Sequence, residues 1–176
     1  MNPYPKLEGV GHIEAFVAEP ASLFDALQRT IAWDTRMRAR LTASFGAPYN
    51  YSGITYPPVP MPPELDALAQ RIEDVVQHRI TNCLINLYPE GTSSMGFHSD
   101  SYAHLQPGTT VSIVSLGGPR ILRFRHKAAK EDIVDVPLRS GSLLVMQQRV
   151  QDEWMHALPP EPEAPPRMSL TFRQVL

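Results

Sequence analysis

The C-terminal stretch Arg167-Met168-Ser169-Leu170-Thr171-Phe172-Arg173 decides the fold class of this chain. Apolar and polar side chains alternate along it with the period of a β-strand, so the apolar set faces a core and the polar set shares the opposite face. If that polar face lies inside a barrel, its two arginines need an anionic partner, and a dicarboxylate would suit their guanidinium forks. A strand whose arginines are simply solvated is the alternative.

Further segments of the same character lie upstream of this stretch, beyond His78. They are rich in β-branched residues, and Pro and Gly turn signals separate some of them, as expected for strands. Many short strands close together favour a β-sandwich or a jelly roll. The strands expected on this pattern are residues 81–88, 109–116, 121–125, 133–137, 142–146 and 168–175.

The first half of the chain has a different pattern. Apolar residues at helical spacing predict one helix over residues 22–31 and a second helix that begins at Pro62-Pro63. Between them, residues 33–40 alternate basic with apolar side chains and predict a strand with one basic face. The remaining segments lack a regular period, so an extended arm is expected at residues 1–20 and a loop or irregular hairpin at 46–63.

Composition limits the classes of protein to consider. The chain has 176 residues, of which 43% are apolar and 19% charged, so it suits one folded domain. A formal net charge of −2 excludes a nucleic-acid binder held mainly by net charge, but leaves room for a local basic patch. The single Cys83 excludes an internal disulfide framework, which makes the cytoplasm the default compartment. No membrane span, secretory signal or obligate protein partner is readable.

One short motif suggests a metal site. In His98-Ser99-Asp100 the imidazole and the carboxylate share a strand face, and His156 follows within another apolar segment. Two histidines and one carboxylate on one face of an iron leave positions open, as in non-heme Fe(II) oxygenases. The motif alone is weak, because a surface histidine and a turn aspartate often fall at this spacing. Asn86 and Tyr88 also share a face and could add hydrogen bonds to the same ligand.

Taken in order, these motifs resemble the AlkB family of Fe(II)/2-oxoglutarate dioxygenases. The resemblance rests on Asn86-x-Tyr88, His98-x-Asp100, His156 and Arg167-x5-Arg173, and it runs from about residue 36 to the end of the chain. Further similar stretches are residues 85–89, 114–117, 123–127, 140–144 and 169–173. Residues 40–46 and 49–53 look like the branch of the family that repairs alkylated DNA and RNA.

The resemblance implies an α+β, mainly β fold: a double-stranded β-helix (jelly-roll) barrel with two helices packed on one sheet. Residues 1–176 would form a single domain, with N-terminal helices and a nucleotide-lid region in 1–80 and the catalytic core in 81–176. The cofactors would be Fe(II), 2-oxoglutarate and O2. The residues implied as iron ligands are His98, Asp100 and His156.

The cosubstrate would bind within the same barrel. On the resemblance, Arg173 would pair with the distal carboxylate of 2-oxoglutarate and Arg167 would help near the metal end. Asn86 and Tyr88 would complete this pocket.

The resemblance also implies a reaction and a substrate. The enzyme would remove alkyl groups oxidatively from bases in DNA or RNA, giving succinate, CO2 and an aldehyde. Tyr51 would stack on a flipped base opposite His98, with Tyr49 nearby and Tyr102 beside the site. Repair-type relatives carry an acidic residue after the second iron ligand, where this chain has Ser101-Tyr102. The alternative is an AlkB-like oxygenase that hydroxylates a small molecule or a side chain.

Overall fold

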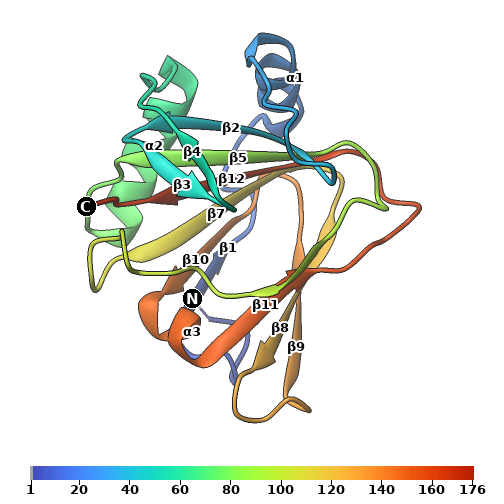
Figure 1. The fold of residues 1–176 in the computed structure, drawn as a ribbon. Coiled ribbons are helices and arrows are strands. Elements are labelled where there is room, and N and C mark those ends of the chain that lie inside the picture. The colour runs from blue at the N-terminus through green and yellow to red at the C-terminus, as the bar shows by residue number, and fades with distance from the viewer. Residues whose placement is uncertain (1) are drawn as a thin grey trace.

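The computed structural model describes residues 2–176 and is built mainly of antiparallel strands (Figure 1). A six-stranded major sheet runs in the order β1 (Val10–Ile13), β10 (Leu143–Gln147), β7 (Thr110–Gly117), β12 (Arg167–Arg173), β5 (Asn82–Tyr88), β2 (Leu41–Gly46). A minor sheet of four strands runs in the order β6 (Met95–His98), β11 (Trp154–Leu158), β8 (Arg120–His126), β9 (Ile133–Leu138). The hairpin of β3 (Tyr49–Tyr51) and β4 (Ile54–Tyr56) lies apart from both sheets.

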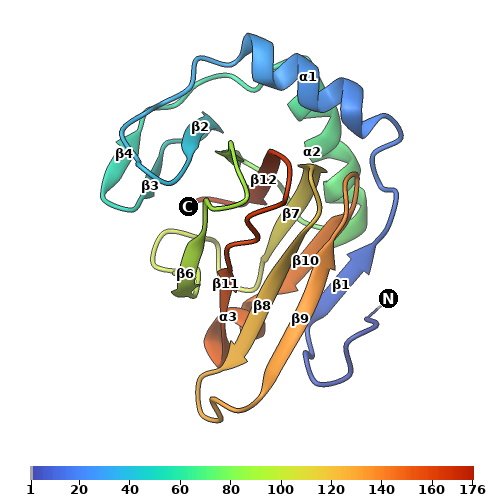
Figure 2. The ribbon, with the colours of Figure 1, turned by 90° about the vertical axis from the view of Figure 1, so that its right-hand side faces the viewer.

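Two longer helices cover the major sheet on the side away from the minor sheet (Figure 2). They are α1 (Pro20–Thr30) and α2 (Pro63–Val76), and both begin with proline in the first turn, where its missing N–H costs nothing. A short helix, α3 (Gln148–Glu153), connects β10 to β11. The expected jelly-roll fold with two helices on one sheet is therefore confirmed.

The alternation along β12 separates two cores. Met168, Leu170 and Phe172 pack with Leu65 and Ile72 of α2 in a helix-side cluster. A second cluster lies between the two sheets and includes side chains from β7, β8, β9 and β10. The polar face of β12 thus opens into the space between the sheets, because each strand of the major sheet buries its other face against the helices.

The segment 33–40 is not the strand that its alternation predicted. It contributes a single bridge, from Asp34 to Thr42, and the Asp34 carboxylate accepts hydrogen bonds from the backbone and the guanidinium of Arg36. This local turn offers the backbone an alternative to a sheet ladder, which is how aspartate interrupts strands.

Four strands of the two sheets were not expected from the sequence. One is β2, which follows directly after the segment 33–40 and pairs with β5. Val10–Ile13, within the predicted extended arm, pairs with β10 at the edge of the major sheet. The strands β6 and β11 pair with each other through a register shift between His156 and Leu158, and they carry the candidate metal ligands. Within residues 2–176, no helix is both long and apolar enough to cross a membrane.

Candidate active site

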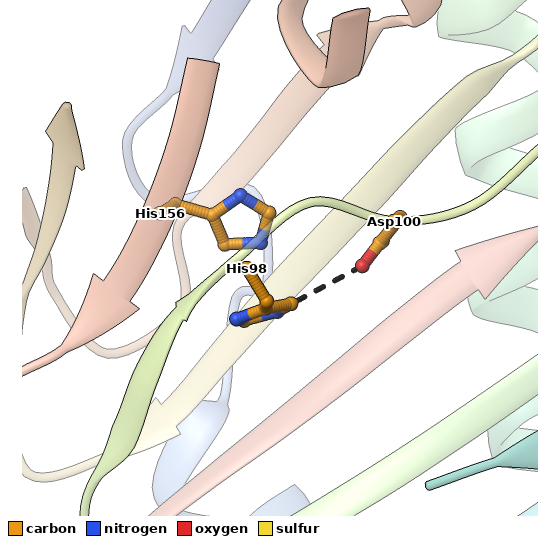
Figure 3. Close-up of side chains that lie close together, drawn as sticks. All are labelled: His98, Asp100 and His156. Carbon is orange, nitrogen blue, oxygen red and sulfur yellow. Dashed lines mark ion pairs between the residues drawn. The ribbon is translucent and has the colours of Figure 1, made fainter. Parts of the chain in front are cut away.

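The pairing of β6 with β11 places His156 directly opposite His98. The two imidazole rings have centroids 4.3 Å apart, and Asp100 follows β6 with a carboxylate oxygen 3.9 Å from His98 Nε2 (Figure 3). Ligand atoms of these three residues lie within 4.8 Å of one another. Two imidazole nitrogens and one carboxylate converging at this spacing fit a divalent iron ion and leave other coordination positions free.

Hydrogen bonds from β11 and α3 hold the segment that carries Asp100. Ser99 Oγ donates to the Trp154 carbonyl oxygen at 2.7 Å, and the Asp100 backbone N–H donates to Gln151 Oε1 at 2.8 Å. His98 Nδ1 bonds the Gly96 carbonyl oxygen, which leaves Nε2 to face the other two ligands. Such supporting contacts fix the orientation of a ligating side chain.

Burial and charge set the protonation of the cluster. Burial lowers the pKa of His156 to about 4, with help from the neighbouring His98 and Arg173, so its imidazole is neutral at pH 7. Burial acts to raise the pKa of Asp100, but Arg173 and the two histidines outweigh it, and the pKa lies below its ordinary value. A neutral imidazole and an ionised carboxylate are the forms that bind a metal ion.

A pocket between the sheets extends from this cluster along β12. Arg173 lies at the metal end, where its Nη2 is 3.1 Å from Asp100 Oδ2. Arg167 lies six residues earlier on the strand, about 20 Å away at the usual rise per residue. The pocket is lined by residues of both sheets, including Tyr51, Asn86, Tyr88, His98, Asp100, His156, Arg167, Ser169, Thr171 and Arg173.

These positions favour a different assignment of the two arginines from the one that the resemblance implied. Arg173 contacts a candidate metal ligand, so it belongs to the metal end of the pocket, and Arg167 belongs to the distal end. The strand pattern correctly put both side chains on one face, but it could not say which end of the strand meets β6.

The distal end of the pocket suits a carboxylate. Arg167 is 2% exposed, and its Nε and Nη1 have no hydrogen-bond partner among residues 2–176. Tyr88 pairs with Arg167 across β5 and β12, and burial raises the pKa of this phenol to about 12, so it keeps its proton to donate. Because unpaired buried donors are costly, these groups are arranged for an anion that binds there.

Arg40 lies beside the pocket and bonds two residues that line it, although the sequence pattern gave it no role in the pocket. Its Nε donates to Asn86 Oδ1 at 3.0 Å, and its Nη2 donates to the Tyr51 hydroxyl at 2.6 Å. Arg40 therefore fixes Asn86 with its amide nitrogen free, and it ties the β3–β4 hairpin to the barrel. The signal in the sequence was the stretch 40–46, which begins at Arg40 and resembles the repair branch of the family.

The three candidate substrate tyrosines have separate surroundings. Tyr51 lines the pocket near His98. Tyr49 lies against Arg173, whose guanidinium is 4.8 Å from the ring centroid, and it is not among the pocket-lining residues. The Tyr102 hydroxyl donates to the Thr109 carbonyl oxygen at 2.8 Å, and its ring packs against the cluster between the sheets. The structure thus brings Tyr51 to the metal cluster but does not bring Tyr102 into the pocket.

Acidic partners partly neutralise the basic residues of segment 33–40 and of β8. Arg36 pairs with Asp34, and Arg123 makes a bidentate pair with Asp135 across β8 and β9. Arg125, by contrast, stacks its guanidinium on the Phe97 ring at 4.0 Å. The positive charge available near the pocket is therefore smaller than the count of basic residues suggests.

The lowered pKa of His156 predicts a pH-dependent stability of the metal-free protein. The unfolded chain has a histidine pKa of about 6.5, so between pH 6.5 and about 4 it binds a proton that the folded state excludes. The contribution of His156 to the free energy of unfolding is therefore fully present above pH 6.5 and is lost as the pH drops, by about 2 kcal/mol at pH 5. Urea unfolding of chelator-treated protein at pH 7 and pH 5 measures this. His156→Gln should abolish this loss, whereas exposed His104→Gln should keep it.

Comparison with known proteins agrees with this geometry. The sequence pattern of the 2OG-Fe(II) oxygenase superfamily matches residues 11–173. The chain is 30% identical over 182 residues to the DNA oxidative demethylase ALKBH2 of Homo sapiens, spanning 90% of this chain and 70% of that protein. It is 34% identical over 177 residues to the alpha-ketoglutarate-dependent dioxygenase alkB homolog 3 of Bos taurus, spanning 89% of this chain and 62% of that protein.

The solved structure of OsALKBH1 shares the fold, with a TM-score of 0.72 at 17% identity, over 94% of this chain and 98% of that one. The match to the superfamily covers both sheets, the histidine–aspartate cluster and the two arginines of β12. The chain therefore belongs to the AlkB family within the 2OG-Fe(II) oxygenase superfamily, and it is an Fe(II)- and 2-oxoglutarate-dependent dioxygenase that uses O2.

Proposed function

We propose that this dioxygenase removes alkyl groups oxidatively from bases in DNA or RNA, with release of succinate, CO2 and an aldehyde. The observation that carries the proposal is the position of Tyr51, whose ring borders the pocket beside His98. A planar ring next to the metal cluster, on a hairpin outside both sheets, suits a base that has been turned out of its strand. The relatives named as a DNA oxidative demethylase and an alkB homolog support it.

We further propose that residues 1–176 work as a single domain. Residues 1–80 would supply the helices and the nucleotide lid, and residues 81–176 the catalytic core. The hydrogen bonds from Arg40 to Tyr51 and to Asn86 support this division of labour, because through them Arg40 joins the hairpin to the strand β5 of the core.

The proposed mechanism assigns each pocket residue a task. His98, Asp100 and His156 would hold the iron, and bound Fe(II) with 2-oxoglutarate and O2 supplies the oxidising chemistry. Arg167 and Tyr88 would orient the distal carboxylate of the cosubstrate by hydrogen bonds. Arg173 would hold Asp100 ionised and in place, and Asn86 would donate its amide N–H toward the cosubstrate.

The stacking role of Tyr51 gives the test of this function. Tyr51→Ala should weaken binding of a methylated oligonucleotide about tenfold to a hundredfold, because base–aromatic stacking contributes about 1 to 3 kcal/mol. Tyr51→Phe keeps the ring and loses the bond to Arg40, so it should cost less than the alanine variant. The measurement is demethylation of methyl-adenine and methyl-cytosine oligonucleotides, with succinate formation in the absence of substrate as the reference.

Equal demethylation rates for wild type and both Tyr51 variants would show that Tyr51 does not stack on the target base. The alternative function, hydroxylation of a small molecule or a side chain, has two observations in its favour. No acidic residue stands directly after Asp100, and Tyr102 is bonded to Thr109 rather than turned to the pocket. If wild type turned over a small molecule but no methylated oligonucleotide, the alternative would replace the proposed function.

A further inference from the structure

Arg120 is the largest fully buried side chain among residues 2–176, and the proposed mechanism does not use it. It is 1% exposed and is the first residue of β8. Because successive side chains of a strand alternate between its faces, Arg120 shares the inward face of β8 with Leu122 and Phe124. Phe124 pairs with His156 of the metal cluster and Leu122 lines the pocket, so Arg120 comes next along the strand, at the end of the pocket away from the metal cluster.

Two long connections of the barrel lie side by side at this end (Figure 1). They are residues 89–94, between β5 and β6, and residues 159–166, between β11 and β12. Arg120 Nη2 donates a hydrogen bond to a carbonyl oxygen of each connection, to Ser93 and to Pro159, both at 2.8 Å. One buried guanidinium group therefore joins both connections to the start of β8.

Further contacts keep the two connections together. The Glu161 backbone N–H donates to the Gly91 carbonyl oxygen at 2.8 Å, and a Cβ on Gly91 would lie 1.8 Å from the Glu161 carbonyl oxygen. The Glu161 carboxylate lies 3.4 Å from Arg120 Nε and accepts a hydrogen bond from the Ile121 backbone N–H at 2.8 Å. Proline makes up five of the eight residues 159–166, and its fixed φ stiffens this connection. We call the two connections, together with Arg120, the distal cap.

The distal cap adjoins the two residues proposed to bind the distal carboxylate of the cosubstrate. Tyr88 is the last residue of β5, directly before the first connection, and Arg167 is the first residue of β12, directly after the second. Arg120 also lies close enough to Arg167 that its charge, after burial, contributes to lowering the pKa of that guanidinium to about 10. The position of the cap is therefore fixed relative to the proposed carboxylate site.

We propose that Arg120 is a positioning residue that keeps the distal cap closed, and that the closed cap limits the cosubstrate to a keto diacid no longer than 2-oxoglutarate. A diacid with one more methylene would have to push its distal carboxylate past Arg167 and against the cap. A closed pocket discriminates against one methylene by about tenfold to two-hundredfold. This inference rests on the proposed assignment of Arg167 to the distal carboxylate, and it adds the residue that sets the length of the diacid.

The test compares three keto acids. They are 2-oxoglutarate, 2-oxoadipate, which has one more methylene, and 2-oxovalerate, which lacks the distal carboxylate. Their Kd values are measured by thermal stabilisation of the Mn(II)-loaded protein, and their kcat/KM values by CO2 release from the Fe(II)-loaded enzyme. In wild type, the Kd of 2-oxoadipate should exceed that of 2-oxoglutarate by about tenfold to two-hundredfold. The Kd of 2-oxovalerate should also be higher than that of 2-oxoglutarate.

Two variants open the cap by different routes. Arg120→Met removes the bonds to both connections, so the Kd of 2-oxoadipate should fall and the ratio of the two Kd values should decrease about tenfold or more. Gly91→Ala leaves every charge in place but displaces the Glu161 backbone, so it should lower the same ratio even if Arg120→Met does not fold. Gly11→Ala makes the matching change in β1, where the nearest atom to a Cβ is 3.7 Å away, and should keep the wild-type ratio.

Different outcomes would contradict the role of the cap and the assignment of Arg167. Equal Kd values for the two diacids in wild type, or a wild-type ratio in folded Arg120→Met and in Gly91→Ala, would show that the cap does not limit the diacid. Weaker binding of all three keto acids by one factor would show that Arg120 only supports the fold. Equal Kd values for 2-oxovalerate and 2-oxoglutarate in wild type would instead contradict the assignment of Arg167 to the distal carboxylate.

Discussion

The His98→Ala variant is expected to lose succinate formation at least about a hundredfold while it keeps its fold. Loss of a group that merely supports a metal ligand costs tenfold to a hundredfold, so loss of a ligand itself should cost no less. His98 is the best of the three cluster residues to test, because its side chain is 32% exposed and its removal leaves no sealed cavity. His156, at 3% exposure, would confound lost chemistry with lost packing.

Two measurements distinguish loss of metal binding from loss of the fold. Binding of Mn(II), a stand-in for Fe(II), should weaken in step with activity, and the melting temperature of the chelated protein should stay within a few degrees of wild type. His104→Ala removes an exposed imidazole from the neighbouring loop and should change neither. An alanine variant at position 98 with full activity would show that iron is held by a different set of residues.

The sequence could predict those strands in which one face is buried against a core. The stretch 167–173 is such a case, since every second side chain packs against the helices. The strand β6 is only four residues long and includes Gly96, so it offers too few alternating positions to recognise. The alternation of basic and apolar residues wrongly predicted a strand at residues 33–40, because hydrogen bonds from Arg36 to the Asp34 carboxylate form a local turn there.

The candidate site was predictable in its residue types but not in its arrangement. The histidine–aspartate motif and the spacing of the β12 arginines are local, so they can be read along the chain. The order of the arginines from the metal depends on how β6 meets β12 across the barrel, which no local pattern encodes. The same holds for Arg40, whose bond to Asn86 requires β2 to pair with β5.

The second large effect is expected for Arg167→Met. This substitution should raise the melting temperature of the protein without its cosubstrate but remove the stabilisation by 2-oxoglutarate. Burial lowers the pKa of this guanidinium to about 10, the nearby Arg120 adds repulsion, and Nε and Nη1 lack partners among residues 2–176. Replacing a poorly compensated buried charge with an apolar side chain of similar length is often stabilising by about 1 to 4 kcal/mol. Arg167→Met should therefore raise the melting temperature of the protein without its cosubstrate.

The same substitution should abolish the response to 2-oxoglutarate. Wild type gains stability when a dicarboxylate binds the folded state only, and the gain grows with ligand concentration. In Arg167→Met the distal carboxylate would enter a pocket without its bidentate partner, so thermal stabilisation by 2-oxoglutarate should vanish. Arg167→Lys keeps the charge and loses the fork, so it should raise the 2-oxoglutarate concentration for half-maximal turnover at least about tenfold.

Arg173 provides the comparison that separates the two ends of the pocket. Its guanidinium is held by Asp100 at 3.1 Å, so Arg173→Lys should weaken Mn(II) binding as well as the use of 2-oxoglutarate. Arg167→Lys should leave Mn(II) binding unchanged, because Arg167 lies at the opposite end of β12 from that contact. If Arg167→Lys weakened Mn(II) binding and Arg173→Lys did not, the distal carboxylate would belong to Arg173 after all. Melting curves with Mn(II) alone, 2-oxoglutarate alone and both together distinguish these results, since each ligand then reports on its own end of the pocket.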